Sequence, residues 1–307
     1  MQVLATLLKA SRVAACVLTL ATAAVLAARA TAQTPATNQT NLSNDPQIPI
    51  PADAGFGPLE NAQPKLPVAD ILSKMAEKES EFRKALNNYT YRRSVKIQTL
   101  TRGKVDGEYS QVDDITFAAD GKRFEHTVFA PQSSLERLIL TPEDFDDIRQ
   151  RIPFVLTTEE IGLYNASFVG QQKVDDLNCY VFDVAPKEMQ KGKRYLKARI
   201  WVDAQDLQIV ITAGKNVPDD VRSGHENLSP PFVTYREQID GHYWFPVYTR
   251  ADAVLHFTGG SGYMGEDVHT RQIIKYSDYK RFRSTSRILT DQELIQEEKK
   301  PQTKTPK

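Results

Sequence analysis

The chain has 307 residues, with 39 basic and 39 acidic side chains and therefore no formal net charge at pH 7. This balance argues against a nucleic-acid-binding protein, because such proteins concentrate lysine and arginine on a strongly basic surface. The chain contains two cysteines, Cys16 and Cys179, which is too few for a small disulfide-rich scaffold.

Residues 1–32 have the pattern of a secretory signal peptide. Two basic residues, Lys9 and Arg12, precede an apolar run, and small residues end the segment at Ala32. We therefore expect export to a bacterial periplasm with cleavage after Ala32. An uncleaved inner-membrane anchor and lipoprotein processing at Cys16 are the alternatives, although the apolar run follows this cysteine instead of preceding it.

Cleavage would change both the charge and the cysteine count. Residues 1–32 carry three basic and no acidic side chains, so 36 basic and 39 acidic residues would remain, a net charge of −3. Cys179 would then be alone and could form no internal disulfide. A secreted chain of this size without disulfides fits a bacterial periplasm better than the eukaryotic secretory route.

The segments that flank the folded part have a polar, Pro-rich or charged composition. Residues 33–67 contain seven prolines among Asn, Gln, Thr and Ala, and bury too little apolar surface to offset the entropy lost on ordering. They are predicted to form a disordered linker, which could also tether the protein to a membrane. Residues 291–307 are predicted to form a charged tail, which leaves one folded domain at residues 68–290.

Two helices are predicted in this domain. In VADILSKMAEKESEFRKALNNY, Lys and Glu occupy one face, and the other face carries Ile71, Met75, Phe82, Leu86 and Tyr89 at three- and four-residue spacing or its multiples. A second, short helix is predicted at TPEDFDDIRQRI. There Thr141 can cap the N-terminus, and Pro142 suits the first helical position.

The rest of the domain is predicted to form strands. The segments that alternate between apolar and polar residues are 90–100, 108–117, 123–129, 163–169, 179–184, 194–202, 207–212, 232–239, 242–248, 252–257 and 268–279. Turn sequences separate them, and Asp240-Gly241 is typical of a two-residue hairpin. The expected fold is mainly β with a few helices: a curved antiparallel meander of about eleven strands, forming an open half-barrel covered by helices.

Two hairpins allow more detailed predictions. In YLKARIWVDAQDLQIV, the buried face is expected to carry Ala198, Ile200, Val202, Leu207, Ile209 and Ile211. The stretch TYREQIDGHYWFPVYTRADAVLHF concentrates aromatic residues, which we interpret as a wall of the β-structure, with cavity lining and a protein–protein surface as the alternatives. Pro246 within it lacks a backbone donor and so predicts an edge or a bulge.

Several of these segments resemble one family. The signal peptide, ILSKMAEKESEFRKALNNY and YLKARIWVDAQDLQIV resemble the LolA/LolB-like outer-membrane lipoprotein-sorting superfamily, and YREQIDGHYWFPVYTRAD is similar to the later part of its longer bacterial members. The resemblance covers about residues 68–283. It implies an unclosed β-barrel with helices over its mouth and a hydrophobic cavity that holds acyl chains. It also implies that some relatives act as envelope sensors, which bind lipids or mislocalised proteins.

The resulting functional prediction is a periplasmic, non-catalytic carrier or sensor. It is expected to act as a monomer without a cofactor and to bind a lipid or an acylated lipoprotein. Burial of one long acyl chain would contribute on the order of 10 kcal/mol, at about 0.8 kcal/mol per CH₂. The expected lining combines the helix with the sheet: Met75, Phe82, Leu86, Tyr180, Phe182, Ile200, Ile209, Ile211, Leu255 and Phe257.

Two other classes of function stay open. One is an envelope protein–protein interaction or signalling module that has no lipid ligand. The other is a metal-dependent hydrolase. If Phe257 pairs with Val268 across the Gly-rich loop, His256 faces His269, and the two imidazoles could bind zinc. A carboxylate ligand would come from Asp252 or Asp267.

Overall fold

The structure is a computed structural model that describes residues 55–118, 120–219, 226, 228–258 and 264–282. The predicted signal peptide, most of the predicted linker, most of the Gly-rich loop and the charged tail lie outside the described residues. None of the described helices is long and apolar enough to cross a membrane.

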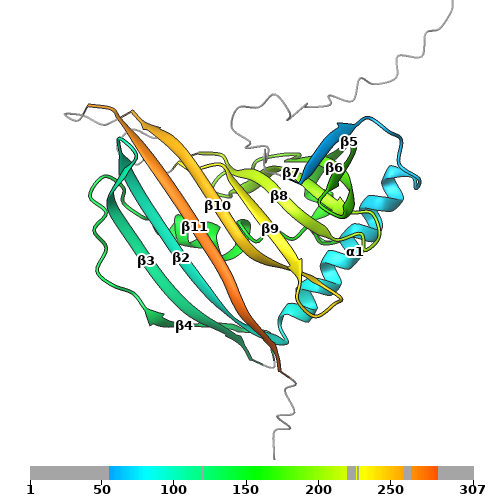
Figure 1. The fold of residues 1–307 in the computed structure, drawn as a ribbon, viewed down its shortest axis with the longest axis horizontal. Helices are drawn as coiled ribbons and strands as arrows, with labels where there is room; N and C mark the ends of the chain where they lie inside the picture. Colours follow the sequence, from blue (N-terminus) through cyan, green and yellow to red (C-terminus); the bar gives the residue numbers. More distant parts are fainter. Residues whose placement is uncertain (1–54, 119, 220–225, 227, 259–263, 283–307) are drawn as a thin grey trace, which may run out of the picture. The chain divides into compact units, whose positions relative to one another are not determined.

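One antiparallel sheet of eleven strands dominates the described residues (Figure 1), in the order β1-β5-β6-β7-β8-β9-β10-β11-β2-β3-β4. No pairing between the end strands β1 and β4 is found in the described part, so the sheet is open. The strands are β1 Phe56–Glu60, β2 Tyr89–Thr101, β3 Lys104–Phe117, β4 Arg123–Phe129, β5 Tyr164–Val174, β6 Leu177–Pro186, β7 Tyr195–Asp203, β8 Ile209–Val217, β9 Phe232–Gln238, β10 Trp244–Phe257 and β11 Glu266–Arg281. This confirms the predicted open, mainly β half-barrel.

The strand count agrees with the prediction through two compensating differences. The predicted segments 242–248 and 252–257 form the single long strand β10, whereas β1 adds a strand that the sequence pattern does not predict. Most neighbours in the sheet are consecutive in the chain. The pairing of β11 with β2 joins the end of the domain to its beginning.

Helix α1 (Val68–Leu86) forms where the apolar spacing predicts it. Asp70 in its first turn and Arg83 and Lys84 in its last turn complement the helix dipole. The buried side chains of α1 are Ile71, Met75, Ala76, Glu79 and Phe82. The sequence pattern predicts a solvated position for Glu79, and this prediction is wrong, because Glu79 has a buried cationic partner.

The second predicted helix is confirmed in part. Helix α2 (Pro142–Asp146) begins with a capping box, in which Thr141 and Asp144 bond each other's backbone N–H groups. The segment continues as the π-helical turn η2 (Asp147–Arg151), and a 3-10 turn, η3 (Ile161–Leu163), precedes β5. We call the sheet face that packs against α1 and the α2–η2 segment the inner face, and the opposite face the outer face.

The main core lies on the inner face. It joins Ile71 and Met75 of α1 and Ile148 of η2 to inward side chains of the sheet, such as Ile97 and Ile200. A second cluster lies on the outer face of β5 to β9 and consists of Val174, Cys179, Val181, Trp201, Val210, Ile211, Ala213 and Val233. Both faces of this part of the sheet are therefore apolar, which explains why its strands show a weak polar–apolar alternation.

A β-bulge in β8 decides the face on which Ile211 lies. Val202 pairs with Ile209 and Trp201 pairs with Ile211, so Val210 is the extra residue. Ile209 stays on the inner face, whereas Val210 and Ile211 join Trp201 on the outer face. The prediction that Ile211 faces the interior is wrong, because strict alternation does not account for an inserted residue.

Strand β1 lies inside the segment whose composition predicts a disordered linker. It pairs with β5, with Phe56 opposite Val174 and Glu60 opposite Gln171. The ring of Phe56 also meets that of Trp201 edge-on, with centroids 5.8 Å apart. Backbone pairing and this aromatic contact order residues 56–60, which corrects the predicted extent of the linker.

The aromatic stretch in β9 and β10 packs as a wall of the sheet. Phe245 is fully buried, with its ring centroid 5.2 Å from that of Phe82 and 4.8 Å from that of Tyr89. The register of β10 against β9 shifts between Pro246 and Tyr248. This confirms the irregularity that the proline predicts.

The loop between β9 and β10 differs from the predicted two-residue turn. Gln238 pairs with Trp244, so the loop spans residues 239–243. The Asp240 carboxylate accepts hydrogen bonds from the backbone N–H groups of His242 and Tyr243, at 3.0 and 2.9 Å. This side chain organises a longer loop in place of a tight turn.

Candidate functional site

A cavity of about 400 Å³ lies on the inner face, between the sheet and the segment that contains α2 and η2. Its sheet wall consists of inward residues from β2, β8, β9, β10 and β11, and its other wall runs from Arg137 to Ile152. Its apolar lining residues are Ile97, Leu138, Ile139, Leu140, Ile148, Ile152, Leu228, Pro230, Phe232, Leu255 and Phe257. The cavity is open to solvent on one side, because the lining residue Ile139 is 85% exposed.

Local structure explains how these residues come together. Alternate residues of one strand share a face, so Leu255 and Phe257 of β10 both point inward, as do Thr270 and Gln272 of β11. The capping box at Thr141 starts α2 directly after the apolar run at residues 138–140. One short segment therefore supplies both apolar and acidic lining.

Acidic groups form part of the lining. The Asp147 carboxylate lies 3.1 Å from Arg194 Nη1 and accepts a hydrogen bond of 3.2 Å from Ser229 Oγ. Glu226 accepts a hydrogen bond of 3.0 Å from the backbone N–H of Thr258. Both carboxylates are thus held by groups of the protein.

Asp144 is a third lining carboxylate, and it is partly buried. It accepts hydrogen bonds from the backbone N–H and the hydroxyl of Thr141, at 2.7 and 3.0 Å. Burial raises the pKa of Asp144 above its usual value, although the bonds from Thr141 act in the opposite direction. The surroundings of this carboxyl group therefore disfavour negative charge.

The rim of the cavity carries a cation that is already neutralised. Arg137 lies 2.6 Å from Glu266 and 3.1 Å from Asp106, and donates to Thr101 Oγ1 and the carbonyl oxygen of Asp267. These contacts fix the start of the 137–152 wall to the ends of β2, β3 and β11. Arg137 thus holds the rim together.

Asn216 of β8 is the polar lining residue whose hydrogen bonding is incomplete. The side chain is 2% exposed, and within the described residues its Oδ1 atom has no hydrogen-bond partner. Buried polar atoms of proteins are nearly always paired, so an unpaired acceptor beside a cavity indicates a place for a donor from outside the chain.

Of the ten predicted lining residues, two line this cavity, Leu255 and Phe257. The others are packed side chains. Met75, Tyr180, Phe182, Ile200 and Ile209 belong to the main core, and Phe82 and Leu86 pack in the cluster around Phe245. Ile211 lies on the outer face.

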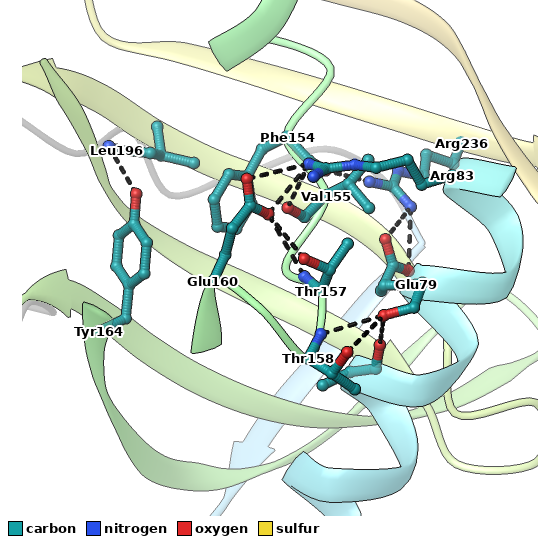
Figure 2. A network of polar contacts seen from close by, with 12 residues as sticks. Glu79, Arg83, Phe154, Val155, Thr157, Thr158, Glu160, Tyr164, Leu196 and Arg236 are labelled. Carbon is teal, nitrogen blue, oxygen red and sulfur yellow. Dashed lines mark hydrogen bonds and ion pairs between the residues drawn. The ribbon is translucent and has the colours of Figure 1, made fainter. Parts of the chain in front are cut away.

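The reason is that α1 is anchored tightly on the sheet (Figure 2). Arg236 Nη1 lies 3.0 Å from Glu79 Oε2, and the backbone N–H of Ile209 donates to Glu79 Oε1 at 3.0 Å. Arg236 also donates to the carbonyl oxygen of Phe154. These bonds hold α1, β8, β9 and the segment after η2 in direct contact. The cavity lies where residues 137–152 face the sheet in place of α1.

A second set of contacts in Figure 2 joins α1 to the segment that precedes η3. Arg83 Nη2 lies 2.9 Å from Glu160 Oε2, and Ser80 Oγ accepts a hydrogen bond of 3.0 Å from the backbone N–H of Thr158. Glu160 in turn accepts a hydrogen bond of 3.1 Å from the hydroxyl of Thr157. The segment between η2 and η3 is thereby fixed along α1.

Sequence reasoning missed the residues of the 137–152 wall and Asn216. A signal for the first was present, since an apolar run, LIL, stands immediately before the predicted cap at Thr141. No signal in the sequence distinguishes Asn216 from a residue in a turn or on the surface, because its position follows from the register of β8.

The paired histidines predicted for a metal site do not face each other. Phe257 pairs with Glu266 instead of Val268, so His256 lies opposite Asp267, and His269 lies opposite Val254. The predicted register is wrong by two residues.

Each histidine instead has its own carboxylate on the outer face. His256 Nδ1 lies 2.6 Å from Asp267, and His269 Nε2 lies 2.5 Å from Asp252. In the part of the chain that the structure describes, no group of three His, Cys, Asp or Glu residues is arranged to hold a metal ion.

Comparisons with known proteins identify similar folds. No protein-family model matches the chain, and no curated protein sequence matches it. A DUF1329 family protein from Desulfovibrio piger has a TM-score of 0.34 and 14% identity, over 71% of this chain and 92% of its own. A LolA superfamily protein from Nitrosomonas europaea has a TM-score of 0.31 and 15% identity, over 71% and 94%.

A third structure, a domain named for outer membrane lipoprotein sorting from Vibrio parahaemolyticus, has a TM-score of 0.31 and 11% identity, over 71% of this chain and 95% of its own. The similarity to LolA-like folds that the sequence indicates is therefore found among solved structures too.

Proposed function

We propose that this protein is a non-catalytic carrier or sensor of the bacterial cell envelope, which holds an acyl chain of a lipid or of an acylated protein in the inner-face cavity. The observation that carries this proposal is the cavity itself: about 400 Å³ with a mainly apolar lining. Ligand sites typically measure roughly 300–1,000 Å³ and combine apolar walls with a few polar groups.

The physical basis is the removal of apolar surface from water. Each buried CH₂ group contributes about 0.8 kcal/mol, so a chain that fills the cavity gains enough free energy to bind without a covalent step. Leu255 and Phe257 from β10 and Phe232 from β9 supply the sheet side of this surface. Leu138 and Leu140 supply the facing side.

An envelope location is part of the proposal. Its support is the signal-peptide pattern of residues 1–32 and the Pro-rich composition of residues 33–54, which would let the folded part stand away from a membrane. We therefore infer a sorting or sensing role in the periplasm, with the protein as a monomer. This role accounts for both the signal-peptide pattern and the apolar cavity.

The test compares two tryptophan substitutions at adjacent positions of β10. Leu255→Trp adds volume inside the cavity, whereas Val254→Trp adds the same side chain on the outer face, where Val254 is 48% exposed. We expect wild type and Val254→Trp to bind a palmitoyl ligand with equal affinity, and Leu255→Trp to lose at least about tenfold, since a filled cavity excludes part of the chain.

Binding would be measured by displacement of a fluorescent acyl probe, and native mass spectrometry with organic extraction would identify acyl adducts on protein purified from its own envelope. Circular dichroism would show that both variants are folded. Equal loss in both variants, or an absence of acyl adducts together with no binding of palmitoyl ligands, would refute the carrier proposal. The second result would favour an envelope protein as the partner.

A further inference from the structure

We propose that the ligand of this cavity has an uncharged head group that donates a hydrogen bond, such as an amide N–H or a hydroxyl, and that the cavity discriminates against anionic head groups. This inference rests on the proposed function, because it concerns the chemical class of the ligand in the same cavity. Its evidence is the charge balance of the lining and the unpaired oxygen of Asn216.

The charge balance of the described lining is negative. Asp144, Asp147 and Glu226 contribute carboxylates, and Arg137 is the cation among the described lining residues. Behind the lining, Arg194 compensates one of these charges through its ion pair with Asp147. Arg137 is already bound to two carboxylates, those of Glu266 and Asp106, and so offers little positive potential to a ligand. A carboxylate or phosphate that enters the cavity would lose its hydration without gaining an unpaired counter-ion from the described lining.

The surroundings of Asp144 also indicate that negative charge is unfavourable at the cavity wall. In the described part of the chain, no cationic side chain forms an ion pair with Asp144. Its hydrogen-bond partner is Thr141, and the charge of Arg194 favours its ionised form only in part. The raised pKa of its carboxyl group shows that one negative charge is already disfavoured at this wall. A second negative charge nearby would add repulsion to the loss of hydration.

Asn216 indicates what the head group must provide. Its Oδ1 atom is buried without a donor in the described residues, and the side chain lines the cavity on β8. A neutral ligand with an N–H or O–H group beside its acyl chain can supply this donor. A methyl ester or a deprotonated acid has no donor to offer.

The experiment compares four palmitoyl ligands that share one chain: palmitate, methyl palmitate, palmitamide and monopalmitoylglycerol. Displacement of a fluorescent acyl probe at neutral pH gives their relative affinities. We expect palmitamide and monopalmitoylglycerol to bind about tenfold more tightly than methyl palmitate, because each adds one hydrogen bond to a buried acceptor. Palmitate should bind most weakly. The tighter of the two donors would indicate whether an acylated amine or a glycerolipid is the natural source.

Two variants tie the selectivity to named residues. Asn216→Leu should remove the preference, so that palmitamide and methyl palmitate bind with the same affinity as each other. Asn178→Leu, at an exposed position on β6, is the matched control and should preserve the preference. Asp144→Asn should raise the affinity for palmitate, because one negative charge leaves the wall.

The outcomes separate this inference from the function on which it rests. If palmitate binds as tightly as palmitamide, or if Asn216→Leu retains the preference for palmitamide, the head-group inference is wrong while acyl binding stands. If none of the four ligands binds to folded wild-type protein, the proposed function fails and the inference fails with it.

Discussion

At the residue scale, the buried ion pair between Glu79 and Arg236 distinguishes α1 from an ordinary amphipathic helix on a sheet. Both side chains are almost completely buried, at 0% and 2% exposure. The Arg236 guanidinium also lies over the ring of Phe82, 5.4 Å from its centroid. Removal of one member of such a pair leaves an uncompensated buried charge, which is more destabilising than the loss of the attraction itself.

We predict that Glu79→Gln lowers the free energy of unfolding by about 3 kcal/mol, because Arg236 loses its counter-charge. Glu81→Gln on the exposed face of the same helix should change it by less than about 0.5 kcal/mol. Urea unfolding followed by circular dichroism measures both. Equal, small effects in the two variants would show that the buried pair does not anchor α1.

At the element scale, β1 is a short edge strand whose place depends on a glycine in its neighbour. A Cβ atom at Gly170 of β5 would lie 2.4 Å from the carbonyl oxygen of Glu60, far inside van der Waals contact. The other contacts of β1 are few, chiefly its pairing with β5 and the edge-on approach of Phe56 to Trp201. A displacement at Gly170 is therefore expected to detach the whole strand.

We predict that Gly170→Ala releases β1 while the rest of the sheet stays folded. Proteolysis before residue 60 should become faster, and Trp201 fluorescence should shift to longer wavelength as Phe56 leaves its ring. Gly162→Ala is the control, since nothing lies within 4 Å of the added atom. Unchanged proteolysis in Gly170→Ala would mean that β5 shifts to accommodate the methyl group.

At the scale of the whole molecule, carboxylates set the response to acid. In the described part, six carboxyl groups have folded pKa values below their ordinary values and two, Asp144 and Asp203, have raised values because of burial. The lowered groups are Asp106, Glu108, Asp113, Asp114, Asp240 and Asp252.

Their physical causes are hydrogen bonds and neighbouring cations. Hydrogen bonds from Thr101 and Thr99 lower the pKa of Asp106, and Arg92 lowers that of Asp114 through a hydrogen bond and its charge. At Asp113, burial acts in the opposite direction, but the hydrogen bonds to it outweigh burial. The folded state thus favours the ionised form of these groups.

We predict that the free energy of unfolding is constant near neutral pH and falls as the pH drops below about 4. The ordinary values are 3.8 for Asp and 4.5 for Glu, so the stabilisation by a group with a lowered pKa is present above them and is lost as pH falls through the folded pKa. Asp144 and Asp203 have raised pKa values, so their protonation at low pH favours the folded state and reduces the loss of stability. Urea titrations between neutral pH and about pH 3 measure the free energy of unfolding. A rise in this free energy as the pH falls would contradict the prediction.

Much of the fold followed from local sequence features. The apolar spacing of α1 and the cap at Thr141 are contained in stretches of a few residues, and so is the bulge signal of Pro246. Leu255 and Phe257 were predicted as lining because alternation within one strand is enough to place them inward. Each of these features is determined by residues that are close neighbours in the sequence.

The sequence by itself thus determined an open antiparallel sheet, its order along most of the chain and the presence of α1, because periodicity and turn chemistry act locally. Only the tertiary structure decided where space remains on the inner face. The bulge at Val210, the buried partner of Glu79 and the position of Asn216 each depend on residues far apart in the chain. Contacts of that kind decide whether an inward side chain is packed or lines a cavity.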